Sequence, residues 1–220
     1  MDRLADVLTA AERRELQLQA RDLLERMTRQ LAAHPGLEAP QPVVRPGDAD
    51  DEYRLRRDRL RRVRAAQLAG ALVNEVTAEF AAEEAADAVW LGASLADLGT
   101  TSGSTRQAAR KRWPELGPIY RTRRWLDGHH DHLVAVIGAV LARAGELRGV
   151  GLDHLQPLRD ALDNDEPQPA RWRRLAEAVD RHLRYVADVA VPTTDEAAMA
   201  VDGARGAVAH FDADTAGPTR

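Results

Sequence analysis

Four polar side chains near the middle of the chain have the chemistry to read the edges of DNA bases. They recur at spacings of one, three and four residues, at Arg106, Gln107, Arg110 and Lys111. Such spacings place them on one arc of a helix. Arginine pairs with guanine O6 and N7 in the major groove, and glutamine pairs with adenine N6 and N7. These residues predict base contacts in double-stranded DNA.

Hydroxyl and basic side chains around this segment predict contacts with phosphate. The residues expected to make them are Ser104, Thr105, Arg112, Arg121, Arg123 and Arg124, with Arg57 and Arg61 from an earlier run of arginines. That run has seven arginines between Arg54 and Arg64. It leaves two interpretations open, because such a helix can lie along phosphates or pair with acidic helices of the same chain.

The stretch from 92 to 114 has the residue sizes that two short helices and a tight turn require. Gly99 allows a close approach of the helices, and Gly103 tolerates a positive φ where the chain must turn. Ala109 is expected to face inward, and Pro114 to end the second helix. The expected caps and remaining inward residues are Ser94, Leu95, Leu98 and Thr105 (or Ser104).

With these features, residues 92–113 resemble the helix-turn-helix of bacterial transcription factors, especially the sigma-factor region 4-like type. The matching positions are Ser94, Ala96, Asp97, Leu98, Gly99, Gly103, Thr105, Arg106, Gln107, Ala108 and Ala109. The chain departs from the family at Ser102 and Ser104, where aliphatic residues are usual. The resemblance implies a sequence-specific double-stranded DNA-binding protein, most simply a transcriptional regulator, with helix 105–113 in the major groove.

Composition favours an all-α fold, with a central helix-turn-helix module and helical flanks. Ala, Leu, Arg and Glu are abundant and aromatic residues make up only 4% of the 220 residues. The net charge is −4, but residues 53–124 carry 14 basic and 8 acidic residues, against 17 and 27 in the remainder. A basic middle between acidic ends is compatible with a nucleic-acid partner.

Punctuating residues divide the chain into five predicted parts. These are an N-terminal helix (1–34), a Pro/Gly linker (35–49), the helix-turn-helix module (50–125), a C-terminal helical region for packing or dimerisation (126–208) and a flexible tail (209–220). In the first part, Thr9 to Glu12 forms a capping box for a helix over 9–33. One apolar stripe of that helix is expected to be buried.

Two further segments have amphipathic helical patterns, and the apolar face of each must pack against another element. The long helical pattern from about 50 to 91, with a break near Gly70, is expected to support the turn at Gly92. Its apolar face consists of Leu68, Leu72, Val76, Phe80, Val89 and Trp90. The pattern over 171–189 indicates either core packing or a dimer interface. A single helix-turn-helix reads few bases, so a homodimer is expected.

Other chemistry is not expected from this sequence. The segment 126–133 contains Asp127, His129, His130, Asp131 and His132, but their spacing does not gather ligands on one helix face, and Asp127 is more simply a helix N-cap. We expect no metal, no cofactor and no enzymatic activity, because no phosphate loop or nucleophile arrangement is present. Without cysteine, a signal peptide or a membrane span, a cytoplasmic, nucleoid-associated location is expected. The alternative function is a helical protein–protein adaptor whose basic middle docks an acidic partner.

Overall fold

The computed structural model describes residues 7–38, 50–163 and 167–216 and is all-α. It divides into two compact units, unit 1 (1–82) and unit 2 (83–220), and the boundary falls inside one long helix. The predicted module of residues 50–125 therefore coincides with neither unit. Most of the predicted linker, residues 39–49, lies outside the described residues.

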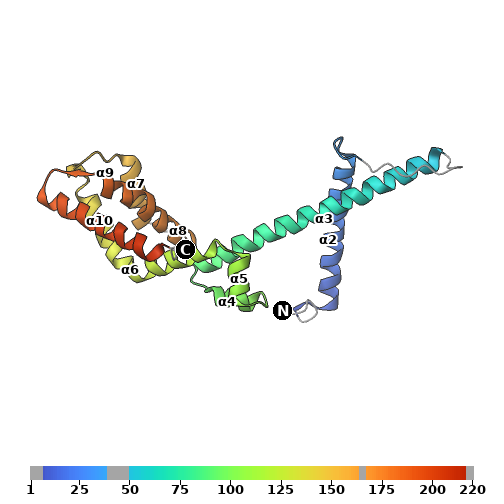
Figure 1. Cartoon of the computed structure of the whole chain (residues 1–220), viewed down its shortest axis with the longest axis horizontal. Coiled ribbons are helices and arrows are strands. Elements are labelled where there is room, and N and C mark those ends of the chain that lie inside the picture. Colours follow the sequence, from blue (N-terminus) through green and yellow to red (C-terminus); the bar gives the residue numbers. More distant parts are fainter. Residues whose placement is uncertain (1–6, 39–49, 164–166, 217–220) are drawn as a thin grey trace. The chain divides into compact units, whose positions relative to one another are not determined.

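Unit 1 contains helix α2 (Ala10–Ala33) and most of helix α3 (Asp50–Trp90) (Figure 1). The predicted capping box is confirmed, since the Thr9 hydroxyl accepts from the Glu12 N–H while the Glu12 carboxylate accepts from the Thr9 N–H. Two sequence expectations are wrong here. Helix α3 has no break at Gly70. No residue of α2 is buried, because Leu16 and Leu23 of its apolar stripe are exposed while Met27 and Leu31 are half-buried.

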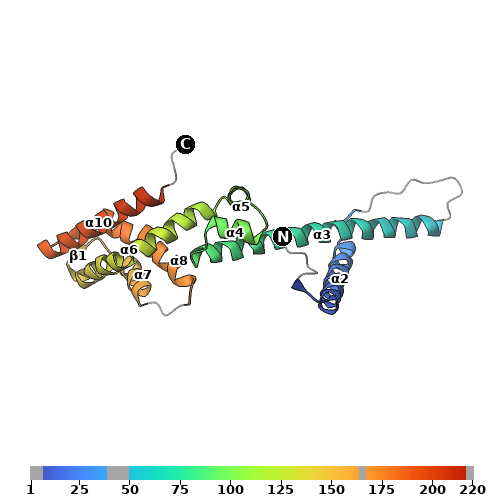
Figure 2. The ribbon, with the colours of Figure 1, turned by 90° about the horizontal axis from the view of Figure 1, so that it is seen from below.

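Unit 2 is a helical bundle built mainly around α6 (Leu116–Ala142) and α10 (Asp195–Thr215), which lie side by side (Figures 1 and 2). Around them lie α7 (Leu152–Leu162), α8 (Ala170–Glu177), the π-helical segment η2 (Ala178–Leu183) and α9 (Arg184–Val189). After α6, the short 3-10 helix η1 (Ala144–Glu146) leads into a two-residue antiparallel ladder. It pairs β1 (Leu147–Arg148) with β2 (Val191–Pro192).

The helix over 171–189 is a core element of unit 2. Leu175, Val179, Leu183 and Val186 are each at most 3% exposed and belong to one apolar cluster with α6, α7 and α10. They cannot reach a second copy of the chain from this position. The interpretation of this helix as a dimer interface is therefore wrong, and core packing explains its stripe.

The C-terminal segment is ordered further than predicted. Thr194 caps α10 by accepting from the Ala197 N–H, and the helix continues to Thr215 because Val208 and Phe211 are buried in the core. Residues 209–215 are thus helical rather than a flexible tail. Residues 217–220 of the predicted tail lie outside the described residues.

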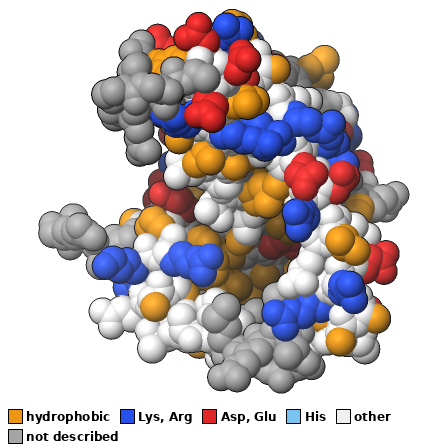
Figure 3. All heavy atoms as spheres, turned by 90° about the vertical axis from the view of Figure 1, so that its right-hand side faces the viewer, with side chains coloured by type: hydrophobic (Ala, Val, Ile, Leu, Met, Phe, Trp, Pro, Cys, Tyr) orange, Lys and Arg blue, Asp and Glu red, His pale blue; other side chains and the backbone are white. Residues whose placement is uncertain are grey.

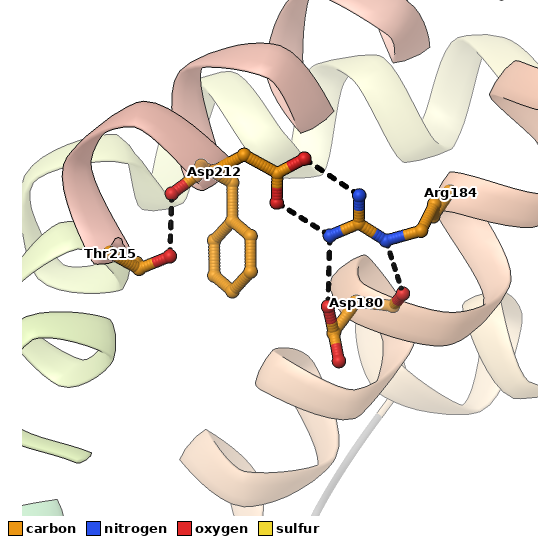
Figure 4. A network of polar contacts seen from close by, with 5 residues as sticks. Asp180, Arg184, Asp212 and Thr215 are labelled. Atoms are coloured by element: carbon orange, nitrogen blue, oxygen red, sulfur yellow. Dashed lines mark hydrogen bonds and ion pairs between the residues drawn. The ribbon is translucent and has the colours of Figure 1, made fainter. Parts of the chain in front are cut away.

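A bidentate ion pair ties α10 to the preceding helices on the surface of unit 2 (Figure 4). Both terminal nitrogens of Arg184 donate to the Asp212 carboxylate, at 2.6 and 2.7 Å. Arg184 also donates to the Asp180 carboxylate and to the Asp180 carbonyl, each at 2.9 Å. The guanidinium lowers the pKa of the Asp212 carboxyl, chiefly by hydrogen bonding.

Candidate nucleic-acid interface

Two short helices joined by a tight turn lie at the predicted place in unit 2. Helix α4 spans Leu95–Thr101 and helix α5 spans Arg106–Arg112. The two helices pack on the last turns of α3 and the start of α6. The shared small core consists of Ala85, Val89, Leu95, Leu98, Ala109 and Leu116.

This core confirms part of the sequence interpretation and corrects another part. Leu95, Leu98 and Ala109 face inward as expected and are 8%, 9% and 1% exposed. The support from α3 comes from Val89, as predicted, and from Ala85, which was not predicted. The four larger side chains predicted for that role, from Leu68 to Phe80, are 44–61% exposed.

The first helix of the motif begins with a capping box. The Ser94 hydroxyl accepts from the Asp97 N–H at 3.2 Å, and the Asp97 carboxylate accepts from the Ser94 N–H at 2.8 Å. The Ser94 N–H and then its hydroxyl stabilise the charged carboxylate, so the pKa of Asp97 lies below its usual value. Sequence reasoning missed the role of Asp97, although the Ser-x-x-Asp spacing is its signal.

The turn depends on two glycines for different reasons. Gly103 has a φ of 61°, the left-handed conformation in which a side chain is unfavourable. A Cβ on Gly99 would lie 3.0 Å from the Ser104 oxygen, the Thr105 carbonyl carbon and the Arg106 nitrogen. All three are backbone atoms, so α4 and α5 approach as closely as a glycine permits. Both predicted glycine roles are confirmed.

The two serines that depart from the family pattern make a polar turn instead of an apolar one. The Ser102 hydroxyl donates to the Leu98 carbonyl at 2.8 Å, with the Gly99 carbonyl as a longer second acceptor at 3.2 Å. Its only hydrogen is thereby used, so in the 2.7 Å contact between the two hydroxyls Ser104 is the donor. Hydrogen bonds from the two serine hydroxyls therefore hold this turn.

Helix α5 presents a basic, exposed face. Thr105 is its N-cap and accepts from the Ala108 N–H at 3.1 Å. The four predicted base-reading residues, Arg106, Gln107, Arg110 and Lys111, are all exposed. They lie on the arc of the helix away from buried Ala109. The structure thus brings this predicted set together on one surface.

The predicted phosphate contacts have different surroundings. Ser104, Thr105, Arg112 and Arg124 are exposed, and the Arg112 guanidinium lies 4.8 Å from the centre of the Trp113 ring. Arg121 is half-buried, and its Nε donates to the Thr215 carbonyl at 2.9 Å. Arg57 and Arg61 belong to unit 1.

Arg123 has a structural role that replaces the predicted one. Its side chain is 14% exposed and lies over the Trp172 ring at 3.7 Å. Its Nε donates to the Trp90 carbonyl at 2.9 Å, and a terminal nitrogen pairs with Asp127 at 3.1 Å. A guanidinium committed to these partners is not available to phosphate. Asp127 is an interior residue of α6 rather than a helix cap, since α6 already begins at Leu116.

Two of the three histidines of α6 are engaged in packing, and the third, His132, is exposed. His129 stacks on Trp125 with ring centres 4.7 Å apart, and His130 lies against Trp172. Within the described residues there is no group of three His, Cys, Asp or Glu side chains that could hold a metal ion. No helix in the described part of the chain is long and apolar enough to cross a membrane.

Comparisons of the chain with models of protein families, with curated proteins and with solved structures find no match. The function of the module must therefore be inferred from its own geometry.

Proposed function

We propose that the chain is a sequence-specific double-stranded DNA-binding protein that acts as a transcriptional regulator. The observation that carries the proposal is the exposed basic arc of α5, held beside a turn whose close approach requires Gly99. A rigid pair of short helices that exposes arginine and glutamine on one arc is suited to entering the major groove.

Roles within the module follow from exposure. Arg106, Gln107, Arg110 and Lys111 read base edges, because they project from the face of α5 opposite its buried residue. The phosphate contacts are assigned to the exposed hydroxyl and basic residues beside this face, Ser104, Thr105, Arg112 and Arg124. Arg123 is left out because it is committed to Trp172 and Asp127.

The proposal is tested by selecting bound sequences from a random duplex pool and measuring affinity for the selected site by fluorescence anisotropy. Arg106→Ala with Gln107→Ala is expected to abolish the preference for that site while leaving the helical circular dichroism spectrum intact. Loss of one bidentate base contact corresponds to roughly 1–3 kcal/mol of discrimination.

A charge-matched control separates base reading from general attraction. Arg110→Ala with Lys111→Ala removes two exposed cations from α5, whereas Arg13→Ala with Arg14→Ala removes two from exposed positions of α2. Only the first pair is expected to weaken binding to the selected duplex and to flatten its dependence on salt. Equal losses in both pairs, or no enrichment from the pool, would favour the adaptor function instead.

A further inference from the structure

Unit 1 leaves an apolar stripe of α2 open to solvent. The stripe contains Leu16, Leu23 and Leu24, which are 50%, 46% and 37% exposed. Helical spacing of this kind normally faces a core. Because no residue of α2 is buried, the described part of the chain leaves these three leucines largely uncovered.

A second stripe is open on α3. Leu68, Leu72, Val76 and Phe80 follow one another every four residues and are 44–61% exposed. With the α2 stripe, they amount to roughly 600–700 Å² of apolar surface per copy, close to the ~800 Å² that each partner contributes to a standard protein interface. On the face of the molecule seen in Figure 3, hydrophobic side chains lie open to solvent among Lys and Arg.

The charges of α3 are separated along its length. Residues 54–64 hold seven arginines and one aspartate, whereas residues 65–90 hold no basic residue and five carboxylates. Two such helices in parallel place like charges together, but in antiparallel orientation each arginine segment faces the carboxylate segment of the other. The complementary partner of this helix is the same helix running in the opposite direction.

We propose that the chain self-associates through unit 1, with the α3 helices of two copies antiparallel about a two-fold axis near residue 70. That axis lies midway between the basic and the acidic segment, and it sets Leu68 opposite Leu72 of the second copy. The interface is isologous, so one surface satisfies both copies. This inference does not depend on the proposed DNA binding.

The first experiment is sedimentation velocity on the full chain. We expect a particle of twice the 24.2 kDa chain mass. Leu68→Asp with Leu72→Asp should weaken the dimer about 100-fold or more, as expected for charges placed at the centre of an interface. The matched control is Leu152→Asp with Met199→Asp, which alters residues that are 76% and 68% exposed in unit 2 and should leave the dimer intact. A wild-type monomer at about 100 μM, well above the Kd of a specific dimer, would overturn the proposal and leave the stripes to a different protein.

The second experiment tests the antiparallel orientation. Arg54→Glu with Arg57→Glu, and separately Glu83→Arg with Glu84→Arg, change exposed residues. With the axis at residue 70, Arg57 of one copy faces Glu83 of the other, so the two variants alter the same contacts. Each variant alone should be monomeric, because its substituted residues then face like charges of the other copy at both ends of the helix pair. An equimolar mixture of the two should regain the dimer as a heterodimer. Dimers of either variant alone, or a mixture that stays monomeric while both circular dichroism spectra remain helical, would exclude this arrangement.

Discussion

Replacing Gly99 by alanine should destabilise unit 2, although alanine is the better helix former. The added Cβ would lie 3.0 Å from three backbone atoms of the turn, at Ser104, Thr105 and Arg106. None of them can turn aside as a side chain does, and a 2.7 Å hydrogen bond from the Ser104 N–H to the Gly99 carbonyl holds the turn in place. Overpacking of this kind costs about 2–3 kcal/mol, and the alanine recovers about 1 kcal/mol of helix propensity. The net loss is about 1–2 kcal/mol.

Gly128→Ala is the matched control, because it makes the same change inside α6 with no atom within 4 Å of the new Cβ. It should stabilise the protein by about 0.5–1 kcal/mol, so the two substitutions have opposite signs. Urea denaturation followed by circular dichroism measures the free energy of unfolding of both variants. In thermal denaturation, each kcal/mol should shift the Tm by roughly 2–4 °C. A Gly99→Ala variant as stable as Gly128→Ala would refute the close approach of α4 and α5.

Three further predictions concern unit 2. Arg123→Ala should cost about 2 kcal/mol in urea denaturation, because it loses an aromatic and a backbone contact, whereas exposed Arg124→Ala should cost little. Arg184→Ala should cost about 1 kcal/mol, and Asp212→Asn a similar amount, because the pair is bidentate but partly exposed. Burial lowers the pKa of the His182 imidazole in the folded protein. As the pH falls, this imidazole is therefore protonated in the unfolded chain before it is protonated in the folded protein. The free energy of unfolding should therefore decrease as the pH drops below about 6.5, and it should decrease less steeply in His182→Gln. Denaturation measured at a series of pH values would show this difference.

Local patterns were enough to predict the helix-turn-helix. A serine or threonine hydroxyl at a helix start accepts a hydrogen bond from a backbone N–H that would otherwise lack a partner, and Ser94 and Thr105 both act as caps in this way. Gly99 and Gly103 follow from steric limits on a turn between adjacent helices. Such requirements act within a few residues, so the order of residues alone reveals them.

Whether an apolar helix face is buried within the chain could not be predicted from local patterns. The stripe over 171–189 and the stripes of α2 and α3 have the same helical spacing, yet Leu183 is fully buried while Leu72 is 44% exposed. Periodicity says that a helix has an apolar side, but which element covers that side depends on contacts between distant parts of the chain.

The exposure of a charged side chain also depends on distant parts of the chain. Arg123 and Arg124 are neighbours of the same type, and the sequence alone assigned both to phosphate. They point to different sides of α6, so that Arg123 meets Trp172, 49 residues away in sequence, while Arg124 stays exposed. The sequence by itself determined the all-α class, the turn at Gly103 and the exposed arc of α5, because these follow from short-range sterics and helical spacing. Only the tertiary structure decided which stripes find a core within the chain and which arginines remain exposed, because burial depends on long-range packing.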